Sequence, residues 1–438
     1  MSAEHPPARQ RDLRTRMFVI FLTSLLVLSA CVADPEITVN EAAATQAPSE
    51  SSATETENTT EPENAVETEN GAETDAVEPL YELRGLLPLE VADVNSLVEF
   101  IEEETGRPFL RPPVIVAQSS DEFFAGLEED LADFDESAEI TVRNLQALGL
   151  TTQGVAEVSQ SFQDLLASPD GVLGYYDPEI DEVYVPVDSL GNDDFRSLLV
   201  HELTHALDGQ HANLNALSEL SDEAEITGNF EPVIALQAVG EGRATAVQNR
   251  WLRANDIPLP DGSEADLDSL ESVPPALVLS LSLPYAFGEQ FIEGNGGPAE
   301  TWDLLDNPPA SSEEFLVPGS TGEAIIDVPA PPADGPILDE SVFGAADLFV
   351  WLLGESLEPT PTLIFPTFTA IDGWAGGRSV LWGDDSESCV RIALVADSTA
   401  DLSEIQAATD LWAELGDGRQ VAVEGDQVTI TSCAPFIP

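Results

Sequence analysis

Apolar residues recur at three- and four-residue steps in several stretches of the chain, which is the spacing of one face of an α-helix. This spacing predicts helices over residues 86–105 and 120–149. A third helix is expected to begin at residue 192, where Asp193 and Asp194 suit the positive end of a helix dipole, and to end at Gly209. A fourth is predicted to include residues 238–252 despite two glycines.

Other parts of the chain alternate apolar and polar residues, which is typical of half-buried strands. Residues 171–188 alternate on both sides of Asp177-Pro178-Glu179, which predicts a β-hairpin just before the third helix. Residues 372–377, DGWAGG, predict a tight turn beside a buried tryptophan. The C-terminal part predicts a helix over 343–353, a strand over 390–395, a helix over 402–415, and strands over 420–423 and 427–431.

The N-terminus has the pattern of an export signal. Four arginines precede an apolar run over residues 17–28, which is short for a membrane span. The run ends in Leu28-Ser29-Ala30-Cys31, a tetrad that resembles a bacterial lipobox, in which the cysteine is lipidated. An ordinary signal peptide or an uncleaved anchor is the alternative. We expect residues 1–31 to be a lipoprotein signal, and the mature chain to be exported and anchored through Cys31 to the outer face of a bacterial membrane.

Composition divides the remaining chain. Residues 32–80 hold thirteen acids, no base and no aromatic residue, which predicts a disordered acidic tether. Hydrophobic residues make up 43% of the chain, enough for a folded core beyond that tether. A proline-rich break at residues 328–332 separates two further parts. We expect an α+β fold, mostly helical with a small sheet, in a larger domain over residues 81–328, and a small C-terminal α/β domain over residues 336–438.

Charge excludes one class of partner. The chain has 82 acids against 15 bases, all of them arginine, for a net charge of −67. Phosphate backbones repel so acidic a protein, so we expect no binding to nucleic acid.

Three of the four histidines lie close together around the end of the third predicted helix. His201-Glu202-Leu203-Thr204-His205 is an HExxH motif, whose histidines lie one helical turn apart, so that both can bind one metal ion. Glu202 lies to the side of that ion and can take a proton from water there. Two structural histidines are the alternative. The spacing, the predicted hairpin and the export signal favour a zinc site.

Zinc held by two histidines needs a third protein ligand and an open position. One candidate is Glu241, if the fourth helix packs beside the third. The other is His211, ten residues after His201, where the metzincin pattern HExxHxxGxxH has its third histidine. Asp208 stands where that pattern has glycine, and both methionines precede the mature chain, which leaves no methionine turn. The sequence favours Glu241 and predicts that His211 supports a ligand or lies in the cleft.

Six segments, in order, resemble those of a family of bacterial exported HExxH proteins that is similar to the gluzincin zinc metallopeptidases: YYDPEIDEVYV, HELTHALDGQHANL, GEGRAT, LPYAFGEQFI, NPPASSEEFL and DGWAGGRSVLW. The resemblance extends over most of the chain from Leu173 onward. It implies a zincin-like fold in which His201, His205 and Glu241 hold Zn²⁺. Thr245 stands where thermolysin-like enzymes have an aspartate four residues after the ligand glutamate, so the groups that support the ligands are expected to differ.

The expected function is hydrolysis of peptide bonds in exported proteins or peptides, with Glu202 as the general base for a metal-activated water. The oxyanion that forms needs a further donor, for which Tyr285 and Tyr176 are candidates, although either ring could serve packing alone. The hairpin could bind substrate by strand addition. Arg243 is expected to form a surface salt bridge. Besides its substrate and the membrane we expect no partner, and a monomeric chain.

A second class of function stays open, in which the chain is a non-catalytic metal- or protein-binding surface lipoprotein that keeps the zincin fold. The intact Glu202 favours the enzyme, because a binding protein has no use for a proton-transfer residue. In an exported chain, Cys389 and Cys433 are predicted to form a disulfide, with two free thiols as the alternative.

Overall fold

The computed structural model describes residues 78–131, 135–166, 172–188, 191–259, 270, 272–317, 319–320, 324–356, 361–416 and 418–438. The predicted export signal, with Cys31, and nearly all of the predicted tether lie outside these ranges. The described residues from Pro79 onward belong to one compact unit, and the break predicted at residues 328–332 lies inside it. Within the described ranges, no helix has both the length and the apolar character that crossing a membrane requires.

The first half of this unit consists of helices around a four-stranded sheet with the order β1-β2-β4-β3. Strands β1, β2 and β4 are parallel, and β3 pairs antiparallel with β4 as the predicted hairpin, which directly precedes α6. The elements are β1 (Glu82–Arg84), α2 (Val91–Thr105), β2 (Val114–Gln118), α3 (Ser120–Leu131), α4 (Asp135–Leu148), α5 (Val155–Leu166), β3 (Tyr175–Asp177), β4 (Glu182–Pro186), α6 (Asn192–His211), α7 (Ala216–Thr227), α8 (Glu231–Ala254) and α10 (Pro275–Gly294).

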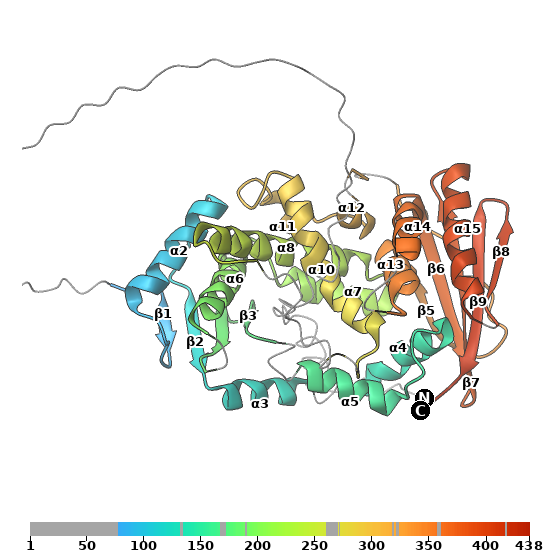
Figure 1. The fold of residues 1–438 in the computed structure, drawn as a ribbon, viewed down its shortest axis with the longest axis horizontal. Helices are drawn as coiled ribbons and strands as arrows, with labels where there is room; N and C mark the ends of the chain where they lie inside the picture. Colours follow the sequence, from blue (N-terminus) through green and yellow to red (C-terminus); the bar gives the residue numbers. More distant parts are fainter. Residues whose placement is uncertain are drawn as a thin grey trace, which may run out of the picture. The chain divides into compact units, whose positions relative to one another are not determined.

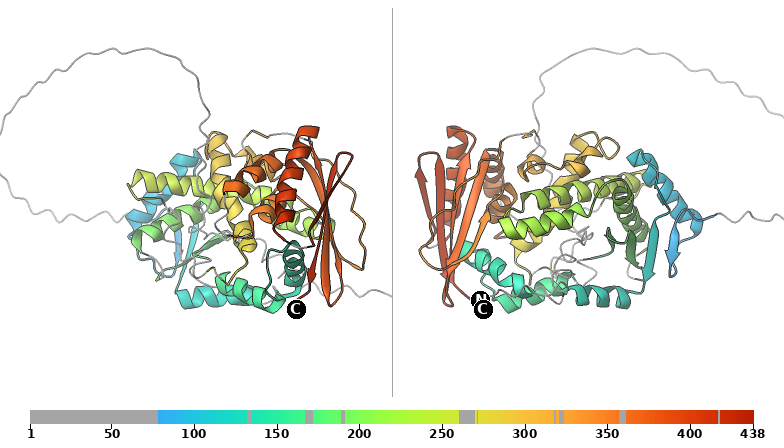
Figure 2. Two further views of the ribbon diagram at one scale, coloured as in Figure 1. Left: turned by 45° about the vertical axis from the view of Figure 1, so that its right-hand side comes forward. Right: turned by 180° about the vertical axis from the view of Figure 1, so that it is seen from behind.

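The second half is built on an antiparallel five-stranded sheet with the order β5-β6-β7-β9-β8. Figures 1 and 2 show this sheet at one end of the unit, the four-stranded sheet and α6 at the other, and α8 and α10 between them. The elements are α11 (Asp303–Asp306), α12 (Glu313–Leu316), β5 (Ile337–Val342), α13 (Ala345–Leu353), α14 (Pro361–Asp372), β6 (Trp374–Gly383), β7 (Glu387–Ala396), α15 (Thr399–Glu414), β8 (Gln420–Glu424) and β9 (Gln427–Pro435).

Mixed helix and sheet content agrees with the α+β class, but several predicted boundaries were wrong. The helix predicted over residues 120–149 is two helices, α3 and α4. The third predicted helix does not end at Gly209, because α6 continues to His211. The end of the first predicted helix at residue 105 is correct, and Gly106 follows α2 in the left-handed conformation with φ of 71° that glycine adopts without strain.

The segment DGWAGG is not the tight turn that the sequence predicts. Trp374 is buried, as expected, but it begins β6, and Gly376 and Gly377 lie inside that strand. A Cβ atom on Gly377 would lie 2.4 Å from the carbonyl oxygen of Phe343. These glycines therefore allow other backbone segments to approach the strand closely.

One hydrophobic cluster joins the two halves. It combines side chains of α8 and α10 with side chains of α13 and the five-stranded sheet, among them Ala238, Leu283, Phe287, Phe349, Trp351, Ile392 and Leu394. Residues before and after the break at 328–332 belong to this one cluster. The C-terminal sheet is therefore packed against the helices that carry the candidate site.

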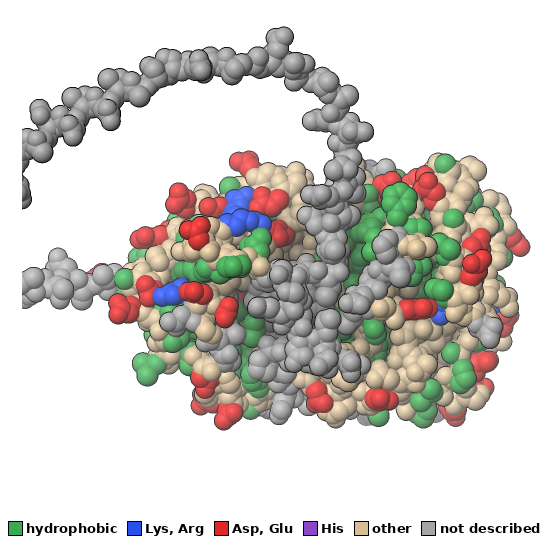
Figure 3. All heavy atoms as spheres, viewed as in Figure 1, with side chains coloured by type: hydrophobic (Ala, Val, Ile, Leu, Met, Phe, Trp, Pro, Cys, Tyr) green, Lys and Arg blue, Asp and Glu red, His purple; other side chains and the backbone are tan. Residues whose placement is uncertain are grey.

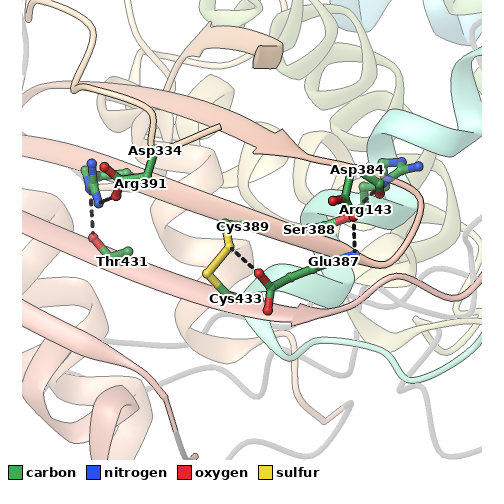
Figure 4. Close-up of a disulfide and its surroundings, with 9 residues drawn as sticks. All are labelled: Arg143, Asp334, Asp384, Glu387, Ser388, Cys389, Arg391, Thr431 and Cys433. Carbon is green, nitrogen blue, oxygen red and sulfur yellow. Dashed lines mark hydrogen bonds and ion pairs between the residues drawn. A yellow bond between two sulfur atoms is a disulfide. The ribbon is translucent and has the colours of Figure 1, made fainter. Parts of the chain in front are cut away.

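The chain directly after the proline-rich segment is attached to the five-stranded sheet. Arg391 of β7 makes an ion pair with Asp334 at 2.7 Å and donates a hydrogen bond to Thr431 of β9 at 3.0 Å (Figure 4). Beside them, Cys389 and Cys433 are directly opposite in β7 and β9 and form the predicted disulfide. Closing a loop of 44 residues, this bond contributes about 4 kcal/mol by loop-closure entropy.

Glu231, at the start of α8, gives the stability of the fold a pH dependence. Its side chain is 3% exposed, and this burial raises its pKa from 4.5 to about 7, although the Ser312 N–H donates to the carboxylate at 2.7 Å. The folded protein therefore binds a proton more tightly than the unfolded chain, so stability is lost as the pH rises from 4.5 through 7.

We expect this loss to be about 3 kcal/mol larger in the wild type than in Glu231→Gln, which has no proton to release. Urea unfolding of both proteins at pH 5 and pH 8 measures it. Equal changes in the two proteins between these pH values would contradict the assignment to Glu231.

Candidate metal centre

The HExxH helix α6 lies against α8, and three predicted ligands meet at their contact. The Nε2 atoms of His201 and His205 are 3.1 Å apart. Oε2 of Glu241 lies 3.2 Å from the first and 3.4 Å from the second. All three side chains are buried, and they form a group able to hold a metal ion. No histidine is visible among the described residues on the face shown in Figure 3.

The protonation of these side chains suits a cation. Burial lowers the pKa of His201, which favours a neutral imidazole. Burial alone would raise the pKa of Glu241, but the neighbouring His205 and His201 lower it below its usual value, which favours the carboxylate. A neutral imidazole for His201 and a carboxylate for Glu241 are the forms in which these side chains bind metals.

The distances also fit a four-coordinate ion. A tetrahedral zinc ion with bonds of about 2.0–2.1 Å holds its ligand atoms about 3.3 Å apart. The three observed separations lie between 3.1 and 3.4 Å. Two imidazole nitrogens and one carboxylate oxygen are a donor set that zinc accepts, with the fourth position left for water or substrate.

Glu202 lies next to the first ligand and is fully buried. It faces the start of the hairpin, where a Cβ atom on Gly174 would come within 3.3 Å of its Oε1 atom. Glycine at this position therefore leaves room for the Glu202 carboxylate between α6 and β3.

Tyr285 reaches the same site from α10. Its ring stacks on His201 with centroids 6.3 Å apart, and its side chain lies close to Glu241. Burial, with Glu241 and Glu202 nearby, raises the pKa of Tyr285 well above 10, so the hydroxyl keeps its proton at neutral pH.

Two glycines make this approach possible. A Cβ atom on Gly242 would lie 2.3 Å from the backbone of Gly288, so α8 and α10 touch through their main chains. Gly242 follows Glu241 directly, and Gly288 is three residues after Tyr285. The close helix contact therefore brings the tyrosine to the ligand.

Arg243 corrects a prediction, because it is not on the surface. Its guanidinium is fully buried and binds both carboxylate oxygens of Asp208, at 2.8 and 2.9 Å. It also donates to the Pro298 carbonyl at 2.6 Å and to the Thr301 hydroxyl at 2.9 Å. Because Asp208 is three residues after His205 and Arg243 is two residues after Glu241, this pair fixes α6 against α8 beside the ligands.

The other two predicted site residues have contacts elsewhere. The Tyr176 hydroxyl lies against Gly209 of α6 and donates to Asp181 at 2.9 Å, which stabilises the hairpin.

His211 donates from Nε2 to the Pro108 carbonyl at 2.8 Å, and its ring contacts Trp302 edge to face. The group that could hold a metal ion thus includes Glu241 and not His211, and the Tyr176 hydroxyl is hydrogen-bonded within the hairpin.

Sequence reasoning did not find several residues that shape the site: Gly174, Ser197, Asp208, Gln248 and Gly288. Two signals were available. Asp208 is two turns after His201 on the same helix face, and Gln248 is two turns after Glu241 on the next. A polar residue on the buried face of each ligand helix indicates a group that supports a ligand.

Comparison of the chain with models of known protein families, with curated proteins and with solved structures finds no match in any of the three. The geometry of the described residues therefore carries the argument for function.

Proposed function

We propose that the protein is a zinc-dependent peptidase with a zincin-like catalytic region, exported and held at the outer face of a bacterial membrane by a lipid on Cys31. The observation that carries this proposal is the meeting of His201, His205 and Glu241 beside the buried carboxylate of Glu202. Its substrates would be exported proteins or peptides, and nucleic acid would not bind to so acidic a chain.

His201, His205 and Glu241 would hold the zinc ion. When bound, the ion would supply Lewis acidity, which lowers the pKa of water and polarises the carbonyl of the scissile bond. Glu202 would accept the proton of the attacking water and deliver it to the amine that leaves. The room that Gly174 provides beside Glu202 supports this role, because the carboxylate can approach the reacting atoms without a side chain in the way.

Tyr285 would stabilise the developing negative charge. Its raised pKa means that it acts as an O–H donor and not as a base. A donor directed at the oxygen where charge develops contributes roughly 100-fold to 1,000-fold in rate.

Strand β3 has an edge to which a peptide substrate could be added as a further strand. It is an edge strand of the four-stranded sheet, and it begins directly after Gly174, beside Glu202. A peptide added along this edge would make main-chain hydrogen bonds to β3 and carry its scissile bond past Glu202.

Burial of the site favours a second candidate function. The three ligands are at most 5% exposed and Tyr285 is 8% exposed, which also suits an enclosed metal that has a structural role. In that case the protein would be a non-catalytic metal- or protein-binding lipoprotein.

Glu202→Gln distinguishes the two functions. The amide keeps the shape of the side chain but cannot accept a proton, so we expect cleavage of a peptide library to fall about 1,000-fold while zinc content stays at one equivalent. Metal analysis and cleavage assays on both purified proteins measure this. Zinc without cleavage in the wild type would support the binding protein, and a wild type without zinc would overturn the proposal.

A further inference from the structure

The second ring nitrogen of His201 is held by a residue outside the ligand set. His201 Nδ1 lies 3.2 Å from Oε1 of Gln248, an amide oxygen that can only accept a hydrogen bond. Nδ1 therefore carries the proton in the neutral imidazole, and the lone pair of Nε2 is directed at Glu241 and His205. This is the form of His201 that binds a metal ion.

Ser197 fixes which end of the Gln248 amide faces the histidine. Gln248 Nε2 donates to the Ser197 hydroxyl at 3.0 Å and to its backbone carbonyl at 3.4 Å. Because a carbonyl oxygen only accepts, the amide nitrogen must point to Ser197 and the amide oxygen to His201. Both side chains are buried, so water does not compete for these hydrogen bonds.

The two residues belong to the helices that supply the ligands. Ser197 is one turn before His201 in α6, and Gln248 is two turns after Glu241 in α8. Thr245, in the place of the aspartate of thermolysin-like enzymes, has a buried hydroxyl with no hydrogen-bond partner among the described residues. Support for His201 thus comes from Gln248 and not from Thr245.

Gln248 is uncharged, which affects the total charge of the buried groups in the site. Glu241 and Glu202 are buried carboxylates in the site, and together they balance a divalent cation. A carboxylate at position 248 would add a third buried negative charge, whereas the amide orients His201 without one.

We propose that Gln248, oriented by Ser197, is a positioning residue that fixes the tautomer and ring orientation of His201 for a divalent metal ion. This inference rests on the proposed zinc site. It predicts that removal of the amide raises the zinc dissociation constant while the metal-free protein still folds.

The test compares Gln248→Met with Gln146→Met in the full chain. Gln146 is an equally buried glutamine in α4 that donates to the carbonyls of Gln153 and Ile437, away from the metal centre. We expect Gln248→Met to raise the zinc dissociation constant about 10-fold to 100-fold. Gln146→Met should leave it within about twofold. Gln248→Glu keeps an acceptor for His201 Nδ1 but adds a buried charge and loses the donor to Ser197, so its dissociation constant should lie between those of the wild type and Gln248→Met.

Competition with a chromophoric chelator measures zinc affinity, and circular dichroism of the metal-free proteins measures folding. If Gln248→Met does not fold, Ser197→Ala decides, with an expected rise of about threefold to tenfold because the amide loses its fixed orientation. Wild-type affinity in the deciding variant, or an equal loss in Gln146→Met, would overturn the inference. Wild-type protein that binds no zinc would instead overturn the proposed function.

Discussion

Replacement of Glu241 by alanine is expected to weaken zinc binding about 1,000-fold, because it removes one of three ligands that together supply most of the binding free energy. His211→Ala is the matched control, since it removes the other candidate for the third ligand. His211 binds the Pro108 carbonyl, so its loss should change the zinc dissociation constant by less than about twofold. Chelator competition on the purified variants measures both.

The opposite order would contradict this assignment. A protein that keeps its zinc without Glu241 and loses it without His211 would have a ligand set of three histidines. Glu241→Gln adds a second comparison, because the amide oxygen keeps the shape of the ligand without its charge. We expect its affinity to lie between those of the wild type and Glu241→Ala.

Asp208→Asn is expected to cost about 3–5 kcal/mol of folding free energy, because it leaves the fully buried Arg243 guanidinium without its carboxylate. Arg250→Met is the control. Arg250 makes ion pairs with Glu293 and Glu104, each at 2.8 Å, but it is 30% exposed, so its loss should cost less than about 1 kcal/mol. Urea unfolding of the metal-free proteins measures both changes.

The double variant Asp208→Leu/Arg243→Met completes this comparison. With no unpaired charge left inside the protein, it should be less destabilised than Asp208→Asn. A cost for Asp208→Asn no greater than that of Arg250→Met would show that the pair does not hold α6 against α8.

Local sequence patterns predicted the part of the site that lies within one helix. The two histidines and Glu202 are set by the periodicity of α6, and the hairpin before it follows from alternation and turn residues. The choice between Glu241 and His211 stayed open because it depends on how α8 packs on α6. One contact in that packing is the Asp208–Arg243 pair, whose members are far apart in the chain.

Arg243 shows why such contacts are missed. An arginine is usually exposed, and nothing within a few residues of Arg243 indicates that Asp208 will meet it in the interior. Gly242 is a second example, because in the sequence it is only a residue that disfavours a helix. Its role, a backbone contact with Gly288 of α10, exists only after the two helices have packed.

Strands were missed for a different reason. Strand β1 has only three residues, and β2 (VIVAQ) is an apolar run without alternation. Strand β6 is buried along almost its whole length and contains three glycines, and a sequence of this kind does not alternate. The antiparallel strands β7, β8 and β9 were predicted because their patterns are local.

The most direct test of the zinc site is the X-ray absorption spectrum of the protein loaded with one equivalent of zinc, recorded at the zinc K edge. The arrangement of His201, His205 and Glu241 predicts two imidazole ligands and otherwise only oxygen ligands, in a four-coordinate shell with bonds of about 2.0 Å. A third imidazole, a sulfur ligand, or a protein that retains no zinc would contradict the account.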